Sequence, residues 1–174
     1  MKKQPFTTEA NLQAFSQAHH ETAAMSAIRT TAFQQYLDLP LAEFPKINYR
    51  RWPLYEGQPF IENQASNGQH ESVTAMIDQQ GVQPATIQLS QEAQAAGVVA
   101  LDFFKAQTQY PKLFAKYYMT LALKTDAHRL AAYHAAAVNS GVLIYIPKNV
   151  KLTEPLTLNF QQDTTTGQTY VHHV

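Results

Sequence analysis

The chain has 174 residues, of which 45% are hydrophobic and 15% charged, enough apolar material for one domain with a sizeable core. Thirteen basic and thirteen acidic residues give a formal net charge of zero, so no whole-chain field steers it to nucleic acid or an anionic membrane. The lack of cysteine excludes disulfides, a thiolate nucleophile and any thiolate-ligated zinc or iron–sulfur site on this chain.

Two N-terminal helices are predicted by capping residues and apolar spacing. Residues 7 to 20 can form the first, with Thr7 or Thr8 as its N-cap. The second carries a stripe at helical spacing that we expect to pack against the core: Met25, Ile28, Ala32, Phe33, Tyr36 and Leu37. It must end near Asp38, because Pro40 disfavours helical geometry at the residue before it.

Basic and aromatic residues alternate in residues 46 to 52, within a proline-punctuated segment. Such a patch can bind single-stranded nucleic acid, since cations meet phosphates while rings stack on bases. Because it is one short patch in a neutral chain, we expect instead an extended segment whose Tyr49 and Trp52 pack inward. Residues 62 to 72 carry almost nothing apolar and predict a loop.

The middle of the chain predicts short strands followed by helices. Residues 73 to 77 and 85 to 89 are strand candidates separated by a turn at Gly81, and Ser90 is the expected N-cap of a short helix. A helical region with one apolar face is predicted next: Leu101, Phe103 and Phe104. Pro111 suits the first position of another helix, whose expected inner stripe is Phe114, Tyr117, Tyr118, Leu121 and Ala122.

The clearest helical pattern spans residues 126 to 139, and Thr125 or Asp126 can cap its start. Its stripe contains small residues that allow close packing on a sheet: Ala127, Leu130, Ala131, His134, Ala135 and Val138. Asn139-Ser140-Gly141 is then expected to stop the helix, with the glycine available for a left-handed turn.

Three β runs follow, at residues 142 to 146, 156 to 160 and 170 to 174. The first is apolar on both faces, which predicts burial on both faces, and Pro147 ends it. We therefore expect the start of a β-helical stack rather than a hairpin. The last run has no charge or proline to protect its edge, so we expect a piece of a longer repetitive β structure that can pair with a second copy.

No catalytic, cofactor or metal site is predicted. His128 and His134 lie about 240° apart on one helix and cannot share a metal, and His134 is expected to be an ordinary core histidine. Adjacent His172 and His173 point to opposite faces of a strand. Phosphate-loop, dinucleotide-binding and hydrolase motifs are absent from the sequence. No signal peptide or membrane span is recognisable, so we expect a non-enzymatic cytoplasmic protein with no nucleic acid or membrane partner.

Residues 109 to 156 resemble the SufB/SufD family of iron–sulfur cluster assembly proteins. The family pattern is a helix with small residues, an N-x-G step into a β run, a Val/Ile-Pro-x-x-Val turn and a proline-led strand. The residues that match this pattern are Asn139, Gly141, Ile146, Pro147, Val150 and Pro155. We expect each of them to have a structural role. The helix that leads into Leu39-Pro40-Leu41 and the Arg50-Arg51-Trp52 segment resemble the SufD branch more than the SufB branch.

The resemblance implies an α+β chain: a helix-rich α+β domain at residues 1 to 140, then the first coils of a right-handed parallel β-helix at 141 to 174. It also implies a non-catalytic scaffold role with SufB-like and SufC-like subunits. The iron–sulfur cluster and ATP, through SufC, would belong to the full assembly, and this segment itself would bind no cofactor.

Two other functions stay open from the residues alone. A β-helix enzyme acting on polysaccharides would need charged residues along one face of the coils, and residues 140 to 174 offer only Lys148, Lys151, Glu154 and Asp163. A generic protein-interaction module would use the segment around Trp52.

Overall fold

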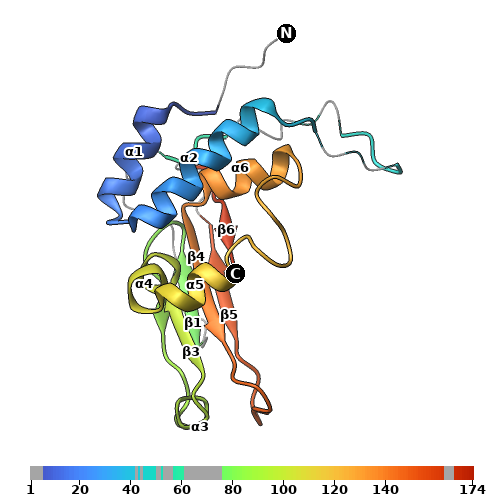
Figure 1. The fold of residues 1–174 in the computed structure, drawn as a ribbon. Coiled ribbons are helices and arrows are strands. Elements are labelled where there is room, and N and C mark those ends of the chain that lie inside the picture. Colours follow the sequence, from blue (N-terminus) through green and yellow to red (C-terminus); the bar gives the residue numbers. More distant parts are fainter. Residues whose placement is uncertain are drawn as a thin grey trace.

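The structure is a computed structural model. It describes residues 6–41, 43, 45–49, 52, 57–60, 76–162 and 167–174. Helices α1 (Glu9–Ala18), α2 (Ala23–Asp38) and α6 (Arg129–Ala137) gather at one end of the molecule, and the strands run away from them (Figure 1). Helices α4 (Phe103–Gln109) and α5 (Pro111–Tyr117) lie beside the strands, and α3 (Gln91–Ala95) sits at the far tip (Figure 1).

Within the described residues, the strands form two three-stranded sheets. In the first, β1 (Ile77–Gln80) pairs antiparallel with β2 (Thr86–Ile87) and parallel with β5 (Leu158–Gln161). In the second, β4 (Ser140–Tyr145) pairs antiparallel with β3 (Val99–Asp102) and parallel with β6 (His172–His173). Since β4 and β5 lie in different sheets, the expected absence of a hairpin is confirmed, as is the α+β class.

Helix α2 forms because a capped start precedes a buried stripe. Thr22 Oγ1 accepts a hydrogen bond from the Met25 N–H at 3.2 Å, which satisfies one free amide of the first turn. The buried stripe of this helix is Met25, Arg29, Ala32, Phe33 and Tyr36. The helix ends at Asp38 as predicted, with Leu39 extended before Pro40. Leu37, expected in the stripe, is instead exposed, because it lies beyond the edge of the face that meets α6.

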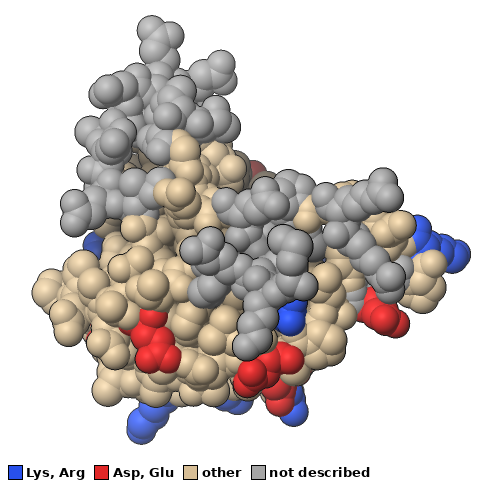
Figure 2. Space-filling view, turned by 90° about the horizontal axis from the view of Figure 1, so that it is seen from above, with Lys and Arg blue, Asp and Glu red and all other residues tan. Residues whose placement is uncertain are grey.

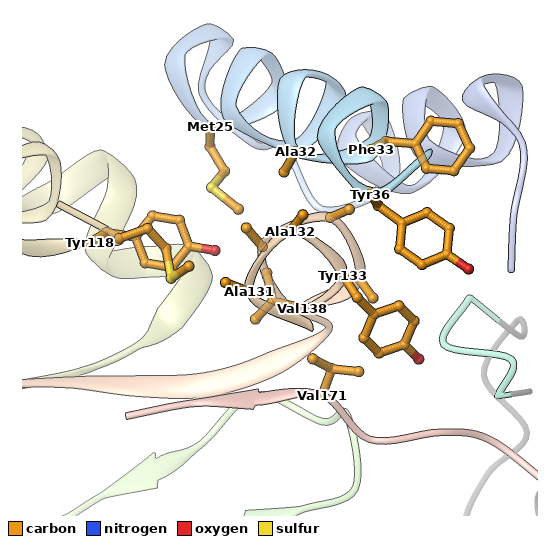
Figure 3. Close-up of a cluster of buried hydrophobic side chains, with 14 of the residues drawn as sticks. Met25, Ala32, Phe33, Tyr36, Tyr118, Ala131, Ala132, Tyr133, Val138 and Val171 are labelled. Carbon is orange, nitrogen blue, oxygen red and sulfur yellow. The ribbon is translucent and has the colours of Figure 1, made fainter. Parts of the chain in front are cut away.

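Two hydrophobic cores fill the molecule. The larger lies at the helical end, where α2 packs on α6 (Figure 3). Five α6 alanines are buried there, and their small side chains allow the two helices to approach closely: Ala131, Ala132, Ala135, Ala136 and Ala137. The smaller core lies between the two sheets and is built on Ile77, Ala85, Ala100 and Val142. In the first half of β4, Val142 faces this core while Leu143 packs on the larger one, as expected for a strand buried on both faces.

Two predicted helices have different bounds. Helix α6 begins at Arg129 rather than at residue 126, because His128 is its N-cap: its Nδ1 accepts from the Ala131 N–H at 3.1 Å. Helix α5 ends at Tyr117, so the predicted stripe fails beyond Phe114 and Tyr118. Tyr117 and Leu121 are 43% and 69% exposed.

Predictions for strands of both sheets were partly wrong. Leu101 belongs to β3 and not to a helix, because it pairs with Leu143 of β4. Strand β1 runs to Gln80, through residues predicted as a turn, because parallel pairing with β5 fixes their backbone. Residues 73–75 of the predicted strand and the predicted loop at 62 to 72 lie outside the described residues. The cap at Ser90 is confirmed, since its Oγ accepts from the Ala93 N–H.

The prediction for the aromatic segment at residues 46 to 52 is only partly confirmed. Tyr49 is buried, but Trp52 is 55% exposed. The Trp52 N–H donates to the Tyr49 carbonyl at 2.9 Å, so a turn joins the two residues. Arg50 and Arg51 lie outside the described residues. Among the helices of the described chain, none combines the length and apolar character needed to cross a bilayer.

Candidate functional site

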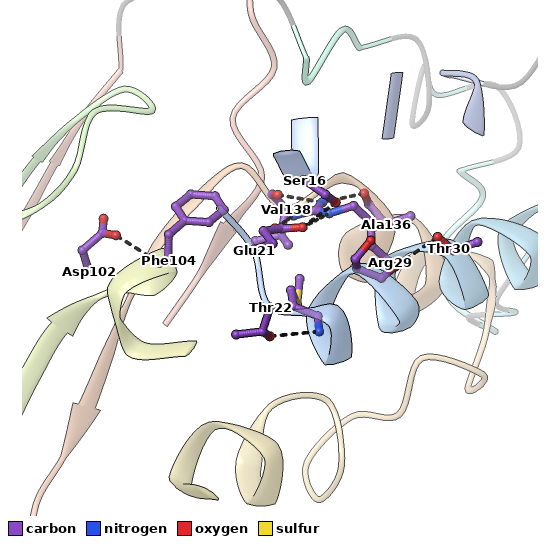
Figure 4. Close-up of polar contacts among 11 residues, drawn as sticks. Ser16, Glu21, Thr22, Arg29, Thr30, Asp102, Phe104, Ala136 and Val138 are labelled. Carbon is purple, nitrogen blue, oxygen red and sulfur yellow. Dashed lines mark hydrogen bonds and ion pairs between the residues drawn. The ribbon is translucent and has the colours of Figure 1, made fainter. Parts of the chain in front are cut away.

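A buried ion pair joins the helices of the helical end. The side chains of Arg29 and Glu21 are 1% and 0% exposed, and the Arg29 Nε–H donates to Glu21 Oε2 at 3.1 Å (Figure 4). Arg29 Nη2 makes a second, shorter contact with Glu21 Oε1. Arg29 Nη1 also donates to the carbonyls of Ala136 and Val138, at 2.7 and 2.9 Å. These carbonyls end α6, where no intrahelical donor remains, so the guanidinium caps the helix.

The surroundings of this ion pair leave little of it unsatisfied. Ser16 Oγ donates to Glu21 Oε2 at 2.7 Å, which brings α1 into the network. The Arg29 guanidinium also lies 4.9 Å from the centre of the Phe15 ring, within the range of a cation–π contact. The network around Arg29 therefore links α1, α2 and the end of α6.

Asn139 occupies the step from α6 into β4. Its amide nitrogen donates to the carbonyls of Pro59 and Thr169, both at 2.7 Å. Its Oδ1 accepts from the Val171 N–H at 2.9 Å, while its own N–H donates to the Val171 carbonyl at 3.1 Å. The side chain is fully buried, and its hydrogen bonds join the start of β4 to Pro59, Thr169 and Val171.

Gly141 does not form the left-handed helix stop that was predicted. It lies inside β4 with φ of +146° and pairs with His173 of β6. A Cβ at this position would stand 2.1 Å from the His173 carbonyl oxygen, so the two backbones approach too closely for any other residue. The helix ends instead at Val138, where Arg29 caps it.

The other four motif residues lie away from this step. Ile146 follows β4 and is 48% exposed, although it was expected to be covered. The carbonyl of Pro147 accepts from the Val150 N–H at 3.2 Å, which closes a turn with Asn149 at φ of +67°. Pro155 is exposed. The structure thus brings together Asn139 and Gly141 but not the rest.

His134 and His173 form a pair that the sequence did not reveal. His134 Nε2 lies 2.8 Å from His173 Nδ1, so α6 and β6 share a hydrogen bond. Burial, and then the neighbouring His173, lower the pKa of His134 to about 4; burial also lowers the pKa of His173. Both rings are therefore neutral at pH 7. The contact depends on the register of β6 against β4, and nothing in the local sequence of either residue signals that register.

No group of three or more histidine, aspartate or glutamate side chains suited to a metal ion exists within the part of the chain that the structure describes. Lys148, Lys151 and Glu154 are exposed in the turn residues between β4 and β5. Seen from above, the charged side chains form small separate groups of both signs on a mostly uncharged surface (Figure 2). The described histidine, aspartate and glutamate side chains therefore build no metal centre, and the charges on the face seen in Figure 2 stay in small groups.

A cavity of about 480 Å³ lies beside the histidine pair. Its walls come from α5 and the turn after it, from α6, and from β4 and β6. Most of its lining is apolar and includes Phe103, Phe114, Met119, Leu123 and Leu143. Such a cavity can accept an apolar group, while the neutral histidines offer hydrogen bonds without charge.

Fold and site together define an α+β protein in which buried polar side chains join segments that are distant in the sequence. A family model described as the SufBD protein N-terminal region matches residues 72–158. The chain therefore belongs to the SufBD family.

Curated relatives agree with this family. The chain is 32% identical over 159 residues to the iron-sulfur cluster assembly protein SufD of Bacillus subtilis, covering 83% of this chain and 36% of that protein. It is 23% identical over 174 residues to an iron-sulfur cluster assembly SufBD family protein of Pyrococcus horikoshii, covering 87% and 39%. A SufBD family protein of Staphylococcus aureus strain USA300 is 32% identical over 73 residues, which are 42% of this chain and 16% of that protein. The chain thus spans less than two fifths of the length of each of these relatives.

Proposed function

We propose that this chain serves as a SufD-like scaffold segment in iron–sulfur cluster assembly, together with SufB-like and SufC-like proteins in the cytoplasm. The observation that carries the proposal is the similarity to the B. subtilis protein named SufD, which extends over 83% of this chain. The segment itself performs no catalytic step and binds no cofactor; ATP and the cluster belong to the rest of the assembly. The buried joints at Arg29 and Asn139 fit such a supporting role.

We also propose that β4, β5 and β6 begin a right-handed parallel β-helix, and that the helix-rich domain ends at residue 140. The parallel β4–β6 and β1–β5 pairings support the stack, because successive coils of a β-helix pair in this way. Strands on both sides of residue 140 pair with each other, so the two proposed domains share their sheets.

A chimera tests the scaffold function. The matching N-terminal part of B. subtilis SufD is replaced by this chain, and the chimera is expressed in a strain that lacks its own SufD. We expect co-purification with the SufB-like and SufC-like proteins of that organism and restored activity of an iron–sulfur enzyme such as aconitase. A chimera that is folded by circular dichroism but neither binds these proteins nor restores the activity would refute the proposal. A crystal structure of the chimera tests the β-helix, since further strands must stack parallel on β6.

A further inference from the structure

The mouth of the 480 Å³ cavity is rimmed by exposed apolar side chains. Tyr117 and Leu123 both line the cavity and are 43% and 39% exposed. Leu121, in the turn between them, is 69% exposed. Single exposed apolar residues are common on protein surfaces. A cluster of three beside an apolar cavity is less common and is typical of an interaction site.

The chain segment that forms this rim carries charge of one sign. Residues 103 to 125 contain four lysines and no aspartate or glutamate, although the chain as a whole is neutral. The Lys116 Nζ lies 5.0 Å from the centre of the Tyr117 ring, so a cation stands at the rim itself. Lys112 lies one helical turn earlier on the same face of α5, and Lys124 follows Leu123 directly. We call Lys112, Lys116, Tyr117, Leu121, Leu123 and Lys124 the basic–apolar surface.

The backbone holds the rim in an exposed position. Met119 has φ of +50°, a left-handed conformation that is unfavourable for a residue with a side chain. The adjacent Thr120 Oγ1 donates to the Lys116 carbonyl at 2.5 Å and so fixes the turn to the end of α5. With Tyr118 and Met119 buried on one side, the following residues face solvent. Residues with strained backbone conformations are concentrated at functional sites.

We propose that the basic–apolar surface docks an acidic amphipathic segment of a partner protein. One apolar side chain of the segment enters the cavity, and its carboxylates meet the lysines. Lysines one turn apart on α5 match carboxylates one turn apart on an acidic helix, since both have the same rise per turn. Leu121 is exposed and does not line the cavity. A peptide can contact both the cavity and Leu121, whereas a small molecule inside the cavity cannot. This proposal goes beyond cluster assembly and does not depend on it.

A designed probe tests the surface with the full chain. The probe is a fluorescein-labelled helical peptide with glutamate on one face and leucine and phenylalanine on the other. Two control peptides replace glutamate by lysine, or the apolar residues by serine. Fluorescence anisotropy is expected to show binding on the order of tenfold tighter than for either control peptide, and weaker binding as salt rises. Equal binding of all three peptides would overturn the proposal.

Matched variants locate the binding. The double variant K112E/K116E changes two exposed lysines of the surface, and K148E/K151E makes the same charge change in the turn after β4. We expect about tenfold weaker probe binding for the first and less than about twofold for the second. Leu121→Ser should weaken binding by about the amount expected for losing one exposed leucine contact, roughly threefold to tenfold. If K112E/K116E does not fold by circular dichroism, Lys116→Gln takes its place.

Three results would contradict the proposal. Equal losses in both double variants would mean that only net charge matters. Binding of phosphatidylglycerol vesicles without binding of the peptide would make the surface a lipid contact. Self-association in sedimentation equilibrium that Leu121→Ser abolishes, without peptide binding, would make it a contact between copies of this chain.

Discussion

The helical end and the strand end of this molecule are stabilised in different ways. At the helical end, α2 meets α6 through buried alanines, and a solvent-excluded ion pair satisfies the last carbonyls of α6. At the strand end, the core between the sheets is smaller, and the chain after β4 is largely exposed. When a substitution removes a buried hydrogen-bond partner, water cannot take its place. At an exposed site, water can form the lost hydrogen bond instead. The two ends should therefore differ most in their tolerance of polar changes.

The largest effect is expected from Arg29→Met. It leaves Glu21 without its partner in a dry site, which typically costs about 3–5 kcal/mol of unfolding free energy. Urea unfolding followed by circular dichroism measures the change. The double variant R29M/E21L removes both charges and should recover part of the loss, since the carbonyls of Ala136 and Val138 still lack their donor. If Arg29→Met costs less than about 1 kcal/mol, the ion pair does not hold this end together.

The next effect is expected at the junction of the two ends, from Gly141→Ala. The new methyl group meets the His173 carbonyl at 2.1 Å and must push β6 away from β4. We expect a loss of about 2–4 kcal/mol, from overpacking and from strain at a positive φ. Gly167→Ala is the matched control, because Gly167 also has positive φ but no atom within 4 Å of the added group. It should cost only about 1–2 kcal/mol. Equal losses in the two variants would show that backbone strain alone is responsible.

A smaller, pH-dependent effect is expected from the histidine pair. The pKa of His134 falls from 6.5 in the unfolded chain to about 4 in the folded one. As the pH falls below 6.5, the unfolded state binds the proton first, so stability is full above that pH and is lost toward pH 4. The loss should be on the order of 3 kcal/mol and should shrink in His134→Gln, as measured by urea unfolding at several pH values.

The smallest effect is expected at the strand end. Ile146→Ser changes an apolar side chain that is 48% exposed, and the loss should stay within about 0.5 kcal/mol. Val142→Ala, four residues earlier in the same β run, should cost about 1–3 kcal/mol, because Val142 is fully buried. Thermal or urea unfolding compares the two. A larger loss for Ile146 than for Val142 would place the core of this end elsewhere.

Elements with local signals were the ones that the sequence predicted well. The end of α2 before Pro40, the Ser90 cap, the start of α5 at Pro111 and the apolar pattern of α6 each depend on residues within one or two turns. The bounds failed where a competing local cap or a distant strand decided them, as at His128 and at Gln80.

The candidate site was harder to predict because its contacts are distant in the chain. Arg29 lies within the buried stripe of α2, but its role as a cap appears only where α2 meets the end of α6. The partner of His134 is 39 residues away, and the role of Gly141 depends on where β6 lies. Pattern and propensity describe a segment, whereas these roles are created when segments meet.

The hydrogen bonds of Asn139 also have a consequence for the chemical ageing of the protein. Deamidation of this side chain would keep its shape but replace the NH2 donor by an oxygen. A carboxylate would then face the carbonyls of Pro59 and Thr169, which now accept from the amide at 2.7 Å. A single hydrolysed amide would thus turn two attractive contacts into two repulsive ones and release the segment that leads into β6. The variant Asn139→Asp makes the same change directly and should unfold at a lower urea concentration than the unchanged chain.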